Sequence, residues 1–100
     1  MPARTRRISF LAAGDGPRLA GILHLPDGPT PCPAAVVCHP HPLMGGTMDS
    51  AVVVAVCGGL AVRGWATLRF DFRGAGRSEG TFDGGHGEID DVAGALDFLA

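Results

Sequence analysis

The sequence predicts an α/β domain in which a β-hairpin is followed by strand, helix, strand and helix. Two short apolar runs, at 34–38 and 65–72, have the composition of buried parallel strands. A longer apolar stretch over 50–63 lies between them and suits a crossover helix, and an amphipathic stretch begins at His86. We therefore expect one mostly parallel sheet with a helix layer on each face.

Length and composition limit the domain count and the class of partner. The chain has 100 residues, enough for one small domain, and its 46% hydrophobic content excludes a disordered tail. A net charge of −2 gives no reason to expect a nucleic acid or an anionic membrane as partner. Thr5-Arg6-Arg7 is similar to a twin-arginine export signal, but the apolar stretch after it ends at Gly14, too early for such a peptide. We expect a cytoplasmic protein whose three cysteines are reduced.

The first two strands are expected to form a hairpin. Ile8 and Phe10 alternate with polar residues, as in a half-buried strand. The segment 14–17, Gly-Asp-Gly-Pro, predicts a turn, and 19–25 returns with its leucines at 19, 23 and 25 on one face. A loop rich in proline, glycine and aspartate then leads to the strand at 34–38.

The stretch 50–63 is ambiguous by propensity, because its valines favour a strand and its paired glycines weaken a helix. Its length favours a helix, with Asp49 or Ser50 as the N-cap and Gly64 after the last turn. The residues that recur at helical spacing are Val52, Val56, Gly59, Leu60 and Arg63.

The strand at 65–72 places three apolar side chains on one face, and a glycine-rich loop follows over 73–85. These three side chains are Leu68, Phe70 and Phe72. The final helical pattern continues to Ala100 without a C-cap signal. Its apolar face is expected to consist of Ile89, Val92, Ala93, Leu96 and Leu99.

The turn at 39–46 is the predicted site. Pro40 and Pro42 lack a backbone N–H, so His41 carries the one free backbone donor of residues 40–42. Gly45 and Gly46 allow a ligand to approach the chain closely. A strand end, a stiff turn with exposed N–H groups and a helix start together indicate an anion or oxyanion site.

Two motifs in the glycine-rich loop do not indicate catalysis. Gly74-Ala75-Gly76 begins like a dinucleotide-binding fingerprint, but Glu79 stands where its third glycine is required. Gly76 to Gly80 matches G-x-S-x-G, yet a nucleophile elbow needs a strand directly before it and a helix directly after it. We therefore interpret the segment as a structural loop in which Asp71, Arg73, Gly74 and Ser78 stabilise the backbone.

The segments 39–49 and 68–80 resemble the α/β-hydrolase superfamily, specifically the N-terminal part of capless bacterial serine hydrolases similar to dienelactone hydrolases and prolyl-oligopeptidase-like esterases. The resemblance extends over nearly the whole chain from about Leu19. It implies the N-terminal half of the hydrolase sheet and hydrolysis of an ester, thioester or amide of a small molecule, without a cofactor. It also implies that the backbone N–H of His41 contributes to an oxyanion hole, supported by His39, Gly45 and Gly46.

The resemblance implies that no catalytic residue lies in this chain. The family places its nucleophile strand and the rest of its triad after the segment that corresponds to 86–100, so we expect the nucleophile and the triad base beyond Ala100. Residues 1–100 would then be one incomplete domain, inactive by itself, which carries the oxyanion half of the site. Two alternatives stay open: a non-catalytic fragment or assembly module, and a metal site on His39 and His41 with Cys38 or His86.

The resemblance also implies a strand order. The strand at 66–72 should lie between those at 19–25 and 34–38, and the strand at 8–11 should pair with 19–25. The strand at 34–38 would then be an open edge without charged residues, so self-association is possible there.

Overall fold

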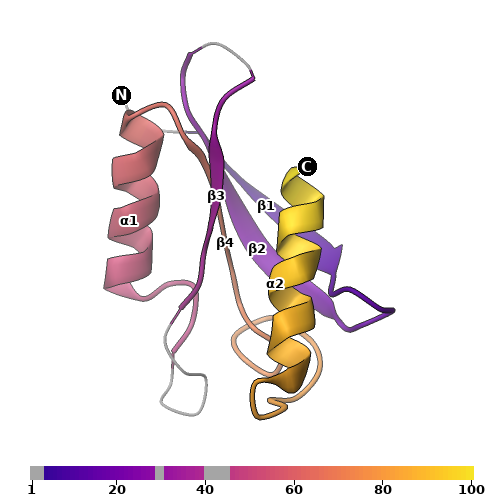
Figure 1. Ribbon diagram of the computed structural model, residues 1–100. Coiled ribbons are helices and arrows are strands. Elements are labelled where there is room, and N and C mark those ends of the chain that lie inside the picture. Colours follow the sequence, from indigo (N-terminus) through magenta and orange to yellow (C-terminus); the bar gives the residue numbers. More distant parts are fainter. Residues whose placement is uncertain (1–3, 29–30, 40–45) are drawn as a thin grey trace.

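The described residues form one four-stranded sheet between two helices (Figure 1). The computed structural model describes residues 4–28, 31–39 and 46–100. In chain order the elements are β1 (Arg4–Leu11), β2 (Arg18–Leu25), β3 (Ala34–Val37), α1 (Ala51–Val62), β4 (Ala66–Phe70) and α2 (His86–Leu99). The hairpin, the crossover helix and the final helix are therefore where the sequence predicted them.

The strand order is β1-β2-β4-β3, as expected. β1 with β2 and β2 with β4 are antiparallel pairs, whereas β3 and β4 are parallel. The described sheet is therefore mixed. Both antiparallel pairs involve β2 of the hairpin, and the parallel pair joins β3 to β4. β3 lies at one edge, and its carboxyl end and that of β4 are at the same end of the sheet.

The main hydrophobic core lies between the sheet and α2. Strand residues from β1, β2 and β4 contribute alternate side chains to it, because every second residue of a strand faces the same side. The members are Phe10, Ala12, Leu19, Leu68, Phe70 and Ala95, with Ile8, Val36, Phe72, Val92 and Leu99 packed around them. Phe72 joins Leu68 and Phe70 as expected, although the strand itself ends at Phe70.

The buried stripe of α1 differs from the one its spacing suggested. Val53, Cys57 and Ala61 face the sheet, whereas Val52 is 72% exposed. Because this helix is apolar around most of its circumference, hydrophobic spacing cannot identify its buried face. Ser50 is the N-cap, but its hydroxyl donates to the carbonyl of Thr47 rather than capping the helix.

The face of α2 was also predicted incorrectly in part. Ile89 and Leu96 are 70% and 55% exposed, although Val92 and Leu99 reach the core. The helix turns Gly94 and Asp91 to the protein instead. At Gly94 the helix lies so close to β1 that an added Cβ would be 2.4 Å from the Leu11 carbonyl oxygen, and this contact sets the rotation of the helix.

α2 extends over His86–Leu99, and the Ala100 N–H donates to the carbonyls of Leu96 and Asp97, at 3.2 Å each. That a nucleophile and a triad base lie beyond Ala100 is not tested by residues 1–100 and stays a prediction.

Candidate active site

His39 and Asp71 lie beyond the carboxyl ends of the two parallel strands. His39 is buried two residues after β3, and its Nε2 accepts a hydrogen bond from the Phe72 backbone N–H at 3.0 Å. Its ring also packs edge-on against the Phe72 ring, with 4.9 Å between centroids. The ring thus joins the end of β3 to the end of β4. His41 and Gly45 lie outside the described residues, and Gly46 is buried.

The Asp71 carboxylate joins the two loops that follow the strands. It is 2% exposed, and its Oδ1 accepts from the Met48 N–H at 2.9 Å. Its Oδ2 accepts from the Arg77 N–H at 3.2 Å. Gly76 makes this approach possible, because its φ is +48° and an added Cβ would be 2.2 Å from Oδ2. Asp71 therefore fixes the turn before α1 against the glycine-rich loop.

Ser78 lies in the glycine-rich loop with its hydroxyl engaged on both sides. Its Oγ accepts from the Ala20 N–H at 2.9 Å and donates to the Asp71 carbonyl oxygen. β4 has already ended at Phe70, and α2 begins only at His86. The segment therefore lacks the strand–turn–helix geometry of a nucleophile elbow, and the Ser78 proton is directed at the backbone.

Arg73 connects the same loop to α2. Its Nε and Nη2 donate to Asp91 Oδ1 at 3.0 and 2.8 Å, and its backbone N–H donates to Oδ2 at 3.0 Å. The Asp91 side chain is fully buried, and Arg73 supplies hydrogen bonds to both of its carboxylate oxygens. The hydrogen bond to Asp91 raises the pKa of Arg73 above its ordinary value. The close approach requires Gly87, whose added Cβ would be 2.2 Å from the guanidinium.

A polar network under the start of α1 was missed by the sequence reasoning. Arg69, 8% exposed, donates from Nε to His24 Nε2 at 3.0 Å. Its Nη1 donates to the Met48 carbonyl at 2.8 Å and to Asp49 Oδ1 at 2.7 Å. Burial first, and the charge of Arg69 second, lower the pKa of His24, so its ring is neutral in this arrangement. The alternation around Leu68 and Phe70 signals that Arg69 faces away from the core, but its partners come from distant segments.

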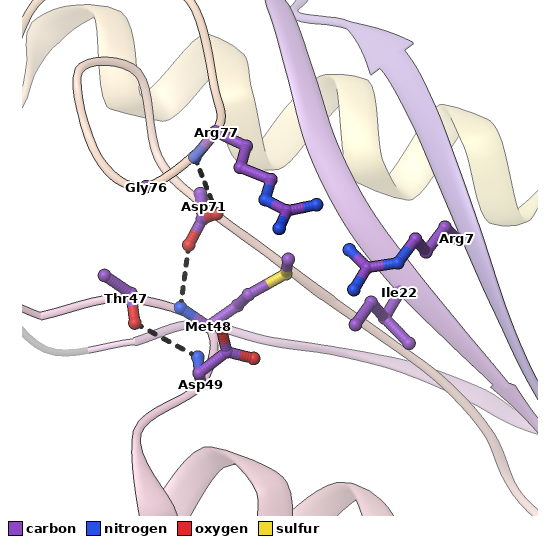
Figure 2. A pocket seen from close by; sticks show the side chains of 8 residues that line it. All are labelled: Arg7, Ile22, Thr47, Met48, Asp49, Asp71, Gly76 and Arg77. Atoms are coloured by element: carbon purple, nitrogen blue, oxygen red, sulfur yellow. Dashed lines mark hydrogen bonds between the residues drawn. The ribbon is translucent and has the colours of Figure 1, made fainter.

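A hollow of about 180 Å³ opens beside this network, and we call it the arginine pocket. Its lining includes Arg7, Ile22, Met48, Asp49, Asp71 and Arg77. Figure 2 shows the guanidinium groups of Arg7 and Arg77 directed toward one another across the space. Sequence reasoning did not identify either arginine.

The side chains that the sequence suggested as metal ligands do not form a metal site within the described residues. Within residues 4–28, 31–39 and 46–100, no group of three or more His, Cys, Asp or Glu side chains could hold a metal ion. Cys32, Cys38 and Cys57 form no disulfide among the described residues, and burial raises the pKa of the Cys57 thiol. No helix of the described chain is long and apolar enough to cross a membrane.

Comparison with known proteins finds relatives of greater length. No family model matches the sequence. The uncharacterized protein RP471 of Rickettsia prowazekii (strain Madrid E) is 48% identical over 67 residues, which are 67% of this chain and 28% of that protein. An α/β serine hydrolase homologue from Coxiella burnetii has a TM-score of 0.85 and 34% identity, covering 94% of this chain and 44% of its own. XC6422 from Xanthomonas campestris, described as an a/b serine hydrolase without lid, has a TM-score of 0.82 and 30% identity, covering 99% and 45%. The chain thus spans less than half of each solved relative.

Proposed function

Because this chain belongs to the α/β-hydrolase superfamily and has the fold of its N-terminal part, we propose that it contributes to a serine-type hydrolase. The bond cleaved is an ester, thioester or amide of a small molecule. The observation that carries the proposal is the convergence of the β3 and β4 carboxyl ends, with His39 and Asp71 holding the following loops together. Open α/β sheets bind their ligands at this edge.

The role of this chain is to stabilise the oxyanion. A serine beyond Ala100 attacks the substrate carbonyl, and the negative charge that develops on the carbonyl oxygen needs N–H donors. We assign one donor to the backbone N–H of His41 and the other to the residue after the serine. The support is indirect: His39 and Gly46, on either side of the turn, are buried, and Asp71 fixes Met48 just beyond it.

Substitutions at His41 test this role in the protein with its full natural chain. His41→Pro removes the proposed donor, so kcat should fall by about 10²–10³-fold. His41→Ala keeps the N–H and should change the rate little. p-Nitrophenyl esters report turnover, and circular dichroism checks the fold. Unaltered turnover in a folded proline variant would remove His41 from the site.

The position of the nucleophile is tested separately with a fluorophosphonate probe. Mass spectrometry should locate the label on a serine outside residues 1–100. Ser78 should stay unlabelled, because its hydroxyl already donates within the loop. Stoichiometric labelling of Ser78 would contradict the proposed arrangement.

A second candidate function, assembly through the sheet edge, is favoured by the position of β3. This strand pairs only with β4 among the described strands, and Ala34–Val37 carry no charge that would discourage a further strand. The 100-residue chain by itself should therefore self-associate. Ala34→Lys puts a charge on an exposed edge position and should shift the chain toward monomer in size-exclusion chromatography. A wild-type chain that elutes as a monomer at all concentrations would exclude this function.

A further inference from the structure

We propose that the arginine pocket binds the phosphate group of a phosphate monoester. Two guanidinium groups, those of Arg7 and Arg77, are directed into one hollow (Figure 2). Neither has an ion pair within the part of the chain that the structure describes. The proposal does not depend on acyl transfer, because it uses neither His41 nor a serine nucleophile.

The strand register places Arg7 in the pocket. Arg7 lies opposite Ile22 in the β1–β2 pair, and Ile22 lies opposite Arg69 in the β2–β4 pair. The three side chains therefore form a row across the face of the sheet that α1 covers. Arg6, the preceding residue, lies opposite Leu23 and belongs to the other face.

The loop after β4 brings Arg77 to the same place. The Asp71 carboxylate accepts from the Arg77 N–H, and the left-handed backbone at Gly76 turns the chain just before it. The backbone from which the Arg77 side chain extends is thus fixed at two successive residues. The Arg77 side chain itself remains to be ordered by a ligand.

The charges around the pocket favour an anion. Both oxygens of Asp71 accept backbone N–H groups, and Asp49 is paired with Arg69 at 2.7 Å. With Arg69 included, three arginines and two aspartates at the pocket leave a net charge of +1, and among the described residues neither aspartate forms an ion pair with Arg7 or Arg77. Two like charges that face each other repel, and an anion between them replaces this repulsion with two attractions.

Size and charge together indicate a phosphate group. The pocket volume of about 180 Å³ is enough for a phosphate group. Guanidinium groups donate in pairs to phosphate oxygens, and a phosphate monoester carries close to two negative charges at pH 7. The two arginines therefore balance the charge of a phosphate monoester. A carboxylate ligand, with one negative charge, would balance only one of the two arginines.

Titration with phenyl phosphate tests the proposal in the protein with its full natural chain, at constant ionic strength. Amide signals of Ile22 and Gly76 should shift in ¹H–¹⁵N spectra. Arg7→Gln and Arg77→Gln should each weaken binding by about fivefold. Arg6→Gln removes the same charge from the same strand but on the opposite face, and should leave the affinity within about twofold. Asp49→Asn removes a negative charge from the rim and should tighten binding.

Ligand comparisons define the chemical class. Benzoate has the same ring with a carboxylate and should bind more weakly than phenyl phosphate. Equal weakening by Arg6→Gln, shifts that do not include Ile22 or Gly76, or equal affinity for benzoate would overturn the proposal. Titration with inorganic phosphate distinguishes a monoester ligand from the free ion. If inorganic phosphate binds as tightly as phenyl phosphate, the pocket is a site for the free ion and the monoester assignment is overturned. If a glutamine variant fails to fold, the location of the wild-type shifts decides.

Discussion

Gly76→Ala should be far more destabilising than the same substitution at Gly84, because only Gly76 touches Asp71. Both glycines have left-handed backbone, with φ of +48° and +62°. An alanine at either position costs about 1–2 kcal/mol in conformational strain. At Gly84 nothing lies within 4 Å of the added Cβ, so the cost should end there.

At Gly76 the added methyl group displaces the Asp71 carboxylate. Asp71 then loses the hydrogen bonds from the Met48 and Arg77 N–H groups, and a hydrogen bond to a charged group contributes about 1.5–3 kcal/mol. The Gly76→Ala variant should therefore lose about 3 kcal/mol more than Gly84→Ala, even at the lower limit for both bonds. Urea denaturation followed by circular dichroism measures both variants.

A double-mutant cycle identifies the cause. In an Asp71→Ala background the carboxylate is already absent, so Gly76→Ala should cost only the backbone strain of about 1–2 kcal/mol. If Gly76→Ala and Gly84→Ala differ by less than about 1 kcal/mol in the wild-type background, Asp71 does not hold the two loops together as described.

Three further predictions concern the elements that position the site. Gly94→Ala should destabilise by about 1–3 kcal/mol, because its Cβ would meet the Leu11 and Ala12 backbone. Gly58→Ala in α1 meets nothing within 4 Å and should stabilise by up to ~1 kcal/mol. The urea midpoint should therefore decrease for Gly94→Ala and increase for Gly58→Ala. Asp91→Ala leaves the Arg73 guanidinium without its partner and should cost about 3–5 kcal/mol, with loss of near-ultraviolet circular dichroism if the loop detaches from α2. The folded protein holds the pKa of His24 below its ordinary value, so the unfolded chain binds its proton first and stability should fall as pH decreases below about 6.5. His24→Gln should flatten that part of the profile, and an unchanged slope would contradict the lowered pKa of His24 in the folded protein.

The order of the elements could be predicted from the sequence because it depends on local information. Strand composition at 34–37 and 66–70, the glycine after α1 and the turn at 14–17 each act within a few residues. The pairing order β1-β2-β4-β3 came from the resemblance carried by the segments 39–49 and 68–80. The position of the candidate site followed, since the ends of parallel strands meet at one edge.

The helix faces were decided by tertiary packing. α1 is apolar on nearly every side, so the sequence could not show that Val53 rather than Val52 is buried. The buried side of α2 is determined by Gly94, which has no side chain, and by Asp91, which pairs with Arg73. A pattern of hydrophobic residues contains neither feature.

The arginine pocket is likewise a product of the tertiary structure. Arg7 and Arg77 are separated along the chain by both β2 and α1, and only the strand register and the Asp71 hydrogen bond bring them to one hollow. Each residue lies in a short motif, 5–7 and 76–80, but neither motif indicates that the two side chains meet. The sequence by itself determined which segments become strands and helices, since that choice rests on neighbouring residues; the sheet register and close glycine contacts decided which distant charges face each other.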